Sequence, residues 1–186
     1  MKRLFDLLLA SIMIVILMVP MIIILIAVIL TSKGPPLYWS DRVGMNNKTY
    51  RMPKFRTMRI DTPEIATHLM SNPNQFFSPI GSFLRSTSLD ELPQLFSILK
   101  GDMTFVGPRP ALFNQDDLIS LRSKNGIDKL LPGLTGLAQI NGRDDLSISE
   151  KVRFDLEYLE KKSFILDIKI LVLTFLKVIK RRGISH

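Results

Sequence analysis

A run of 26 residues without a charged side chain, residues 7–32, constrains this chain more than any other feature. Nearly all of these residues are Leu, Ile, Val or Met, and the run lies between Asp6 and Lys33. As a straight helix it would be about 39 Å long, which exceeds the ~30 Å hydrocarbon core of a bilayer. A cleaved signal peptide has a shorter apolar stretch followed by an Ala-x-Ala site, which this sequence lacks. The run therefore predicts a helix that enters a membrane.

Two observations bear on whether this helix crosses the membrane. Pro20 lies near its middle, where a proline removes a backbone hydrogen bond and costs about 3 kcal/mol or more unless neighbouring groups compensate. Lys2 and Arg3 precede the run, and basic residues that include Lys33 and Arg42 follow it, so both flanks favour the cytoplasmic side. A re-entrant helix that kinks at Pro20 and a kinked single span are both compatible with these residues.

The rest of the chain, residues 34–186, predicts a globular domain that follows a membrane segment of residues 1–33. The whole chain has 25 Lys and Arg against 17 Asp and Glu, no cysteine and two histidines. Disulfides, thiolate zinc sites and histidine-cluster metal sites are therefore excluded. The net charge of +8 suits an anionic lipid surface or a diphosphate ligand, and no motif typical of nucleic-acid binding is present.

The hydropathy pattern predicts an α/β domain that is mostly helical with a small β-hairpin or sheet. Residues 37–42 and 49–55 read as strands around a turn at residues 44–47. Helices are predicted over residues 61–70, over residues 83–100 with an interruption, and from the capping box Ser147-x-x-Glu150. A last helix after Ser163 is apolar with a stripe of Lys169, Lys177 and Lys180. That pattern is typical of a helix in the membrane interface, and also of a helix packed on a core.

The segment Ser88-Leu89-Asp90-Glu91-Leu92-Pro93-Gln94 carries the strongest local signal. Ser88-x-x-Glu91 matches a capping box, which would explain the acids structurally. With that cap, however, the ring of Pro93 would meet the carbonyl of Leu89, so the local signals conflict. A bend there would present Asp90 and Glu91 to a site, with the two carboxylates about 100° apart and thus in different roles. One carboxylate would attack a substrate while the other holds a metal.

Cationic residues stand in two places that suit phosphate binding. Residues 101–106 read as a strand that runs into Gly107-Pro108-Arg109-Pro110, where two prolines would fix the backbone around a guanidinium. Lys54 and Arg56 are at strand spacing, so both can point to one face. A solvated turn and a solvated strand face explain the same residues. The Gly-rich residues 131–143 match neither of the common nucleotide-binding glycine motifs.

Taken together, these segments resemble the bacterial sugar transferase family, the small monotopic phosphoglycosyl transferases, over essentially the whole chain. The most specific matching segments are residues 54–58, 88–94, 100–103, 106–110 and 132–143. Two positions depart from the pattern. Val19 precedes Pro20 where family members often have serine, and Leu137 stands where they often have an aromatic residue.

The resemblance implies a reaction, a location and a fold. A sugar 1-phosphate, expected to be that of an N-acetylated hexosamine, would move from a UDP-sugar to polyprenol phosphate (undecaprenyl phosphate) with Mg²⁺, releasing UMP through a covalent aspartyl intermediate. This would be the first membrane step of bacterial glycoconjugate assembly, at the cytoplasmic face of the inner membrane. The fold implied is a re-entrant membrane helix kinked at Pro20 and a small globular catalytic domain with interfacial amphipathic helices.

Residue roles carry over by position from the same resemblance. Asp90 matches the attacking aspartate and Glu91 its neighbour that helps to hold Mg²⁺, so these two residues are the expected catalytic and metal-binding pair. Arg109 matches the arginine of a Pro-Arg-Pro turn. The other positions expected to bind substrate are Lys54, Arg56, Arg85, Pro108, Pro110, Gln139, Arg143 and Asp167.

Two alternative functions remain on the residues alone. In a non-enzymatic membrane-anchored scaffold, the acid pair would be a helix cap and the basic helix a lipid contact. In a carboxylate-dependent phosphohydrolase, water would take the place of the lipid phosphate.

Overall fold

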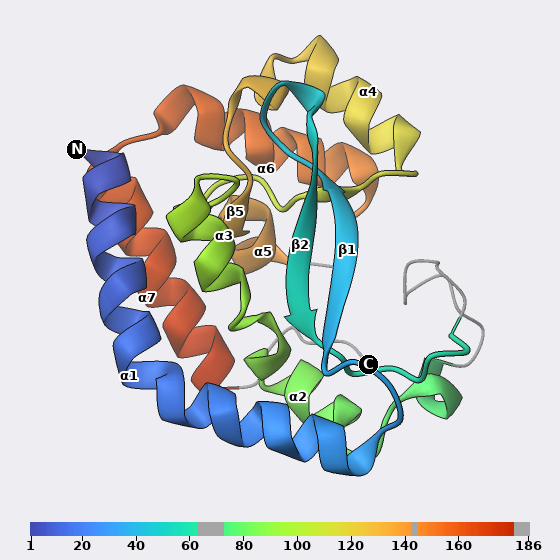
Figure 1. The fold of residues 1–186 in the computed structure, drawn as a ribbon. Helices are drawn as coiled ribbons and strands as arrows, with labels where there is room; N and C mark the ends of the chain where they lie inside the picture. Colours follow the sequence, from blue (N-terminus) through green and yellow to red (C-terminus); the bar gives the residue numbers. More distant parts are fainter. Residues whose placement is uncertain (63–72, 143–144, 181–186) are drawn as a thin grey trace.

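The computed structural model describes residues 1–62, 73–142 and 145–180, and Figure 1 shows their arrangement. The helices are α1 (Lys2–Thr31), α2 (Gly81–Ser86), α3 (Gln94–Lys100), α4 (Asp116–Lys124), α5 (Leu137–Asn141), α6 (Ile148–Lys161) and α7 (Phe164–Lys180). Short 3-10 turns are η1 (Met45–Asn47), η3 (Pro73–Phe76), η4 (Leu89–Glu91) and η5 (Ile127–Lys129). The strands are β1 (Leu37–Val43), β2 (Thr49–Phe55), β3 (Thr104–Val106), β4 (Ala111–Leu112) and β5 (Gly133–Thr135). The chain is thus mostly helical with small sheets, as the sequence predicts.

The strands form two small sheets. β1 pairs with β2 as the predicted antiparallel hairpin, with Tyr38 opposite Lys54 and Arg42 opposite Tyr50. β4 adds to the other edge of β1, which gives the order β2-β1-β4. β3 and β5 pair in parallel. The strand that leads into residues 107–110, which we call the arginine turn, is therefore held by a strand from later in the chain.

Helix α1 is continuous through Pro20, and it bends around the domain. Figure 1 shows α1 in blue running down one edge of the molecule and then turning along the bottom. Its first half packs against a cluster that contains Ile98 and Phe105, and its second half against Phe55 and Leu84. Pro20 is exposed on the outer side, where a missing N–H and a displaced carbonyl permit a bend.

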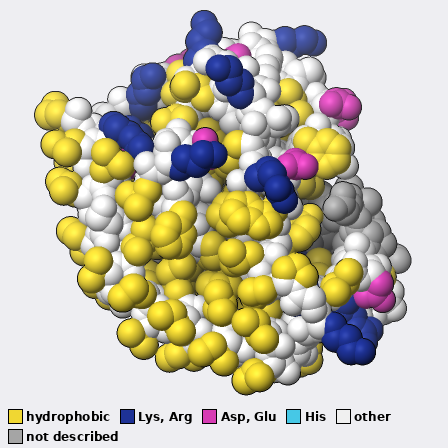
Figure 2. All heavy atoms as spheres, in the orientation of Figure 1, with side chains coloured by type: hydrophobic (Ala, Val, Ile, Leu, Met, Phe, Trp, Pro, Cys, Tyr) yellow, Lys and Arg dark blue, Asp and Glu magenta, His cyan; other side chains and the backbone are white. Residues whose placement is uncertain are grey.

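The outer side of α1 is apolar and uncovered. The apolar side chains of this helix that are each at least 49% exposed are Leu4, Leu8, Ile12, Val15, Ile16, Met18, Val19, Ile22, Ile23, Ile26, Ile29 and Leu30. Exposed apolar residues of α7 and of α2 and α3 add to it, among them Ile165, Phe175, Phe83 and Phe96. Figure 2 shows these yellow side chains gathered over the lower left of the molecule. A patch of this extent is typical of a membrane contact.

Helix α7 confirms the predicted last helix and corrects part of its pattern. Phe164, Ile165 and Val172 are exposed, so the helix presents apolar side chains outward. Lys169 is exposed as expected, whereas the Nζ of Lys177 donates a hydrogen bond to the carbonyl of Ile140 in α5. Lys177 is therefore a tertiary contact and not a member of a solvated stripe.

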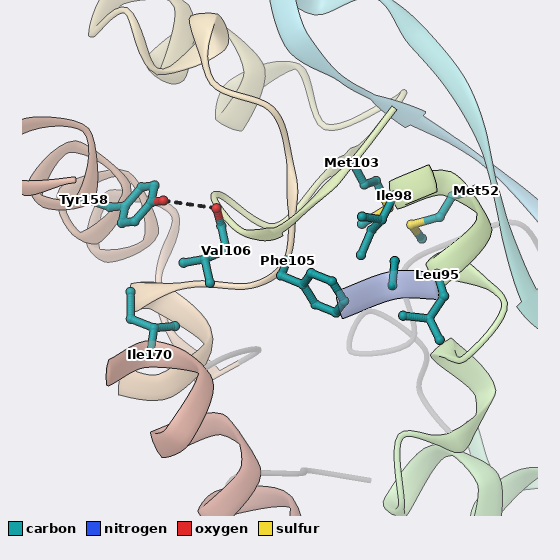
Figure 3. Close-up of a cluster of buried hydrophobic side chains, with 9 residues drawn as sticks. Met52, Leu95, Ile98, Met103, Phe105, Val106, Tyr158 and Ile170 are labelled. Carbon is teal, nitrogen blue, oxygen red and sulfur yellow. Dashed lines mark hydrogen bonds between the residues drawn. The ribbon is translucent and has the colours of Figure 1, made fainter. Parts of the chain in front are cut away.

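The main core lies between α3, β3 and the helices α1, α6 and α7. Figure 3 shows its side chains converging from these elements, with Leu95 and Ile98 from α3, Phe105 and Val106 from β3, and Ile170 from α7. Because these residues are almost fully buried, they fix the spacing between α3 and β3. That spacing matters because α3 follows the acid pair and β3 leads into the arginine turn.

Polar side chains in the first turn of α1 tie this apolar helix to the core. Lys2 Nζ lies 2.6 Å from Asp167 Oδ2 of α7 and donates to the Val106 carbonyl at 2.9 Å. Tyr158 of α6 donates to Asp167 at 2.6 Å and lies 3.1 Å from the same Val106 carbonyl. We call this group of Lys2, Tyr158, Asp167 and the Val106 carbonyl the clasp.

Two more residues of this turn bind elements beside the acid pair and the arginine turn. Arg3 donates to the carbonyls of Ile98 and Leu99 at the C-terminal end of α3, at 2.6 and 2.9 Å. The Ile98 carbonyl also accepts from the Gly101 N–H at 3.2 Å. Carbonyls at the C-terminal end of a helix carry partial negative charge, so a guanidinium is stabilising there. Asp6 is buried and accepts from the Thr104 hydroxyl at 2.7 Å.

The helix over residues 83–100 is interrupted as predicted, since α2 ends at Ser86 and α3 begins at Gln94. Gly101 caps α3 with a φ of 99°. The capping box of Ser147 and Glu150 at the start of α6 is confirmed. The helix predicted over residues 61–70 falls almost entirely outside the described residues.

We expect the clasp to couple Lys2 and Asp167 energetically. Asp167→Asn should leave the Lys2 ammonium without its counter-charge and lower stability, and the Lys2→Met, Asp167→Asn double variant should show a coupling of roughly 0.5–3 kcal/mol. The measurement is reversible chemical unfolding of the four chains in detergent micelles.

The exposed pair Glu157–Lys161 is the matched control, and its cycle should give about 0.3–0.5 kcal/mol. Equal coupling in both cycles would contradict the role given to the clasp.

Candidate active site

The acid pair lies in η4, a single 3-10 turn between α2 and α3. Asp90 and Glu91 are both buried, with 7% and 8% of their surface exposed. Ser88 before them has a left-handed backbone with a φ of 58°, and its side chain makes no capping hydrogen bond. The capping-box alternative is therefore wrong. A non-glycine residue in this conformation is strained, and such strain is concentrated at functional sites.

Two cations contact Glu91 directly. Lys54 Nζ from β2 and Arg109 Nη2 from the arginine turn each lie 2.8 Å from Glu91 Oε1. Lys54 Nζ also lies 3.9 Å from Asp90 Oδ2. The Glu91 carboxylate is thus held between two cations. Lys54, the described cation nearest to Asp90, lies at the longest distance that counts as an ion pair. The two acids have different environments, as the sequence argument expected.

Burial changes the ionisation of this group. Burial raises the pKa of Asp90, and the neighbouring Glu91 carboxylate adds to the rise, while Lys54, Arg85 and Arg109 oppose it. Burial likewise lowers the pKa of Lys54, although Glu91 and Asp90 favour its charged form. Asp90 is therefore a better base and nucleophile than an ordinary aspartate once it is ionised.

Two further arginines surround the pair. Arg85 in the last turn of α2 lowers the pKa of Asp90 by its charge, and its guanidinium lies over the Phe77 ring at 5.4 Å. Arg42 of β1 donates to the Pro110 carbonyl at 3.2 Å and to Ser40 Oγ at 2.9 Å. Burial, and then the charge of Arg109, lower the pKa of Arg42 to about 10. The site thus has four cations around two carboxylates.

The arginine turn is held rigidly from below. Gly107 donates to the Thr135 carbonyl and Gly133 donates to the Pro108 carbonyl, both at 2.8 Å. A Cβ on Gly133 would lie 2.1 Å from the Gly107 nitrogen, so these backbones can approach this closely only with glycine. The Gly-rich segment therefore supports the turn and does not form a nucleotide loop of its own.

A buried ion pair holds the turn from the other side. Arg122 Nη1 of α4 donates to the Arg109 carbonyl at 2.8 Å, and its Nη2 lies 2.6 Å from Asp155 Oδ2 of α6. Arg122 was not expected from the sequence. The sequence gives little indication of this buried role, because a charged residue on a short helix is usually solvated.

The acid pair fits a magnesium ion through its chemistry. Among residues 1–62, 73–142 and 145–180, no group of three or more His, Cys, Asp or Glu side chains is close enough to hold a metal. Mg²⁺ differs from zinc in that one or two carboxylates, substrate phosphates and waters suffice to bind it. Glu91 and Asp90 could hold it, in competition with Lys54 and Arg109.

The structure places the predicted site residues in three groups. Lys54, Arg85, Arg109 and the prolines beside Arg109 gather around the acid pair. Arg56 instead donates through Nη2 to the carbonyls of Ser32 and Gly34 at the end of α1, at 3.3 and 3.0 Å, and Asp167 belongs to the clasp.

Two predicted residues remain apart from the acid pair or cannot be placed. Gln139 lies in α5 with both polar side-chain atoms buried and unpartnered, and no described hydrogen bond joins it to the acid pair. Arg143 lies outside the described residues.

Arg42 is the site residue that sequence reasoning missed. Its signal was available, because alternation along the predicted hairpin puts Tyr38 and Arg42 on one face and the pairing puts Lys54 opposite Tyr38. Arg42 was counted only as a flanking charge of the membrane segment.

Comparison with known proteins adds an independent finding. The family model described as "Bacterial sugar transferase" matches residues 1–181. The chain is 36% identical over 200 residues to the "Undecaprenyl-phosphate galactose phosphotransferase" of Salmonella typhimurium, covering 98% of this chain and 41% of that protein. It is 39% identical over 184 residues to the "UDP-glucose:undecaprenyl-phosphate glucose-1-phosphate transferase" of Escherichia coli, covering 95% and 39%.

A further relative is matched over most of its length. The "Uncharacterized sugar transferase EpsL" of Bacillus subtilis is 38% identical over 186 residues, covering 100% of this chain and 90% of that protein. The chain spans about two fifths of the length of the Salmonella and Escherichia relatives.

The raised pKa of Asp90 predicts that this carboxylate lowers the stability of the fold. Asp90→Asn should unfold at a higher temperature than the parent chain near pH 8, because the buried ionised group is removed. The gain should shrink as the pH falls through the raised pKa of Asp90 and vanish below the ordinary aspartate pKa of about 4, where this group is protonated in both the folded and the unfolded chain. Thermal unfolding in detergent at several pH values measures this. Asp102→Asn, at a partly exposed pair with Lys100, is the control that should show no such gain.

Proposed function

The chain belongs to the bacterial sugar transferase family, and from that premise we propose that it transfers a sugar 1-phosphate from a UDP-sugar to undecaprenyl phosphate and releases UMP. The observation that carries the proposal is the buried acid pair with four cations around it. Two carboxylates with an excess of positive charge suit a reaction between two phosphate-bearing substrates. The exposed apolar face of α1 and α7 supplies the surface on which a lipid acceptor would be met.

We assign the attack to Asp90. Glu91 Oε1 already accepts from two cations, whereas Asp90 is buried, raised in pKa and closest to Lys54 at 3.9 Å. An oxygen of the Asp90 carboxylate would bond to the β-phosphorus, and the bond from that phosphorus to the bridging oxygen would break. The electron pair leaves with UMP, and the sugar phosphate remains on Asp90 as an acyl phosphate.

In the second step an oxygen of undecaprenyl phosphate would attack the same phosphorus. The bond between phosphorus and the Asp90 oxygen breaks, which restores the carboxylate. Lys54 and Arg109 stay beside the reacting phosphoryl group and offset its charge in both steps. Bound Mg²⁺, held by Glu91 with Asp90, would neutralise phosphate oxygens and polarise the phosphorus.

For the donor sugar we propose only its class, a hexose or an N-acetylated hexosamine. The N-acetylated hexosamine expected from the sequence stays a prediction. Two relatives are named for galactose and glucose, so a screen of UDP-hexoses and UDP-N-acetylhexosamines covers both possibilities.

We also propose that α1 re-enters the membrane and leaves it on the cytoplasmic face of the bacterial inner membrane. Arg3 binds the end of α3 at one end of α1, and Arg56 binds Ser32 and Gly34 at the other. A span across ~30 Å of hydrocarbon would put those ends on opposite sides of the bilayer. One small globular domain cannot bind both ends across that thickness, so its contacts favour the re-entrant path over the kinked span.

The proposed reaction predicts a burst of product without acceptor. Purified protein mixed with the UDP-sugar and Mg²⁺, but no undecaprenyl phosphate, should release close to one UMP per active site and retain labelled sugar phosphate on a peptide with Asp90. Asp90→Asn should abolish both, and excess chelator should stop turnover. Lys161→Gln, at an exposed side chain of α6 that pairs with Glu157, is the control and should keep the burst.

The rival functions give other products. Free sugar phosphate with or without acceptor would indicate the phosphohydrolase, and the absence of UMP with every donor would indicate the scaffold. Full turnover without any burst or label would mean direct transfer between the two substrates and would overturn the role of Asp90.

The re-entrant path predicts that both ends of α1 are reached from one side. The chain has no cysteine, so a cysteine inserted between Met1 and Lys2 and a separate Lys33→Cys variant are the only thiols in their chains. Both should react with an impermeant maleimide in inverted vesicles and in neither case with intact spheroplasts. Reaction of the N-terminal thiol in spheroplasts would show a true span.

A further inference from the structure

We infer that Arg42 of β1 and Arg109 form a clamp of two guanidinium groups for the donor phosphate farther from the acid pair, the α-phosphate that leaves with the nucleotide. This inference rests on the proposed function and deepens it. The first observation is that the two cations are neighbours and that Glu91 contacts Arg109 at 2.8 Å but acts on Arg42 only through its charge. Arg42 reaches the carbonyl of Pro110, the residue next to Arg109, and is half-buried.

The described contacts give Arg42 no direct ion pair, and Glu91 favours its charged form only from a distance. Lys54 and Arg109 each contact Glu91 at 2.8 Å, whereas no described carboxylate lies within 4 Å of Arg42. Its described hydrogen bonds use Nε and Nη1 and go to neutral oxygens of Ser40 and Pro110. Two like charges side by side and partly removed from water are unfavourable, and an anion placed between them relieves that cost.

The hairpin gives the direction of the substrate. Lys54 lies opposite Tyr38, and Arg42 is four residues farther along β1, which is about 13 Å at ~3.3 Å per residue. β1 starts just after α1 ends, so Arg42 lies toward the hairpin tip, away from the linker that joins α1 to β1. The long side chains of Lys54, Arg109 and Arg42 can therefore contact the successive phosphates of a diphosphate that extends outward from the acid pair.

This order assigns the clamp to the soluble donor and not to the lipid. The lipid acceptor must approach from the apolar face formed by α1 and α7, whereas Arg42 lies on the side of the site toward the hairpin tip. A small cleft lined by Gly44, Asn47, Arg109 and Pro110 opens at this same end. The nucleoside attached to the α-phosphate would extend in that direction.

The reaction gives such a clamp a function. When the bond between the β-phosphorus and the bridging oxygen breaks, the electron pair moves onto the leaving nucleotide, whose phosphate gains a negative charge. Fixed cations at the position where charge develops stabilise the transition state more than the ground state. This holds whether Asp90 or the lipid phosphate attacks, because the leaving group is the same.

The test compares three variants of the full chain in detergent. Arg42→Gln removes the charge but keeps an N–H that can donate to the Pro110 carbonyl. Arg42→Lys keeps the charge but loses the planar guanidinium with its paired N–H donors. Arg51→Gln is the matched control, since Arg51 is on the opposite face of the same hairpin, over the Trp39 ring at 5.5 Å. The measurements are the affinity for UMP by calorimetry and the KM values for the UDP-sugar and for undecaprenyl phosphate.

We expect Arg42→Gln to weaken UMP binding and raise the donor KM by about 10-fold or more, as for the loss of a charge-assisted hydrogen bond. Arg42→Lys should recover part of the loss, and the KM for undecaprenyl phosphate should change less than about two-fold in every variant. Unchanged UMP affinity in Arg42→Gln would overturn the clamp. A raised KM for undecaprenyl phosphate with unchanged UMP affinity would assign the phosphate to the lipid.

Failure of the proposed function would look different. UMP binding needs no turnover, so a chain that binds UMP through Arg42 but transfers no sugar phosphate would retain the clamp and lose the transferase. If the Arg42→Gln variant instead turns over UDP-sugar at the rate of the parent chain and binds UMP with the same affinity, the transferase function stands and the clamp is wrong.

Discussion

The polar first turn of α1 is the contact on which the rest of this structure depends. Lys2 joins Asp167 and the Val106 carbonyl, Arg3 caps α3, and Asp6 accepts from Thr104 at the start of β3. These bonds attach a helix that is otherwise apolar to the two elements beside the acid pair and the arginine turn. Buried polar groups are costly without partners, so their mutual satisfaction fixes one arrangement of α1, α3 and β3. The apolar helix α1 is thereby part of the framework that positions the acid pair and the arginine turn.

The acid pair differs from the first turn of α1, because its arrangement suits ligand binding at the expense of the stability of the fold. Burial raises the pKa of Asp90, Ser88 has a strained backbone, and Arg42 lies beside Arg109 without a described carboxylate within 4 Å. Each of these features costs free energy in the protein alone, and a bound phosphate would relieve the repulsion between the two arginines. A rigid framework on one side, with Gly133 against Gly107, is what lets the strained side persist.

The sequence predicted those parts of the structure that depend on near neighbours. The hairpin, the capping box of α6, the interruption beside Pro93 and the rigid turn around Arg109 follow from local backbone chemistry. Partners far apart in the chain could not be predicted. Asp167 meets a lysine 165 residues away, and Arg56 turns from the strand face to the end of α1. Their positions are decided by how α1 folds back on the domain, which periodicity does not reveal.

The position of the acid pair between two kinds of surface explains how one small site would serve two unlike substrates. The apolar face of α1 and α7 can hold lipid near the domain, while the hairpin directs Lys54 and Arg42 along a line toward its tip. A water-soluble diphosphate and a lipid phosphate would then reach the same carboxylate from different directions. Because each substrate is an anion, its approach to the Asp90 carboxylate would be unfavourable without nearby cations. Arg109 contacts Glu91 and is a neighbour of Arg42, so it can offset the charge of the donor before UMP leaves and that of the lipid phosphate afterwards.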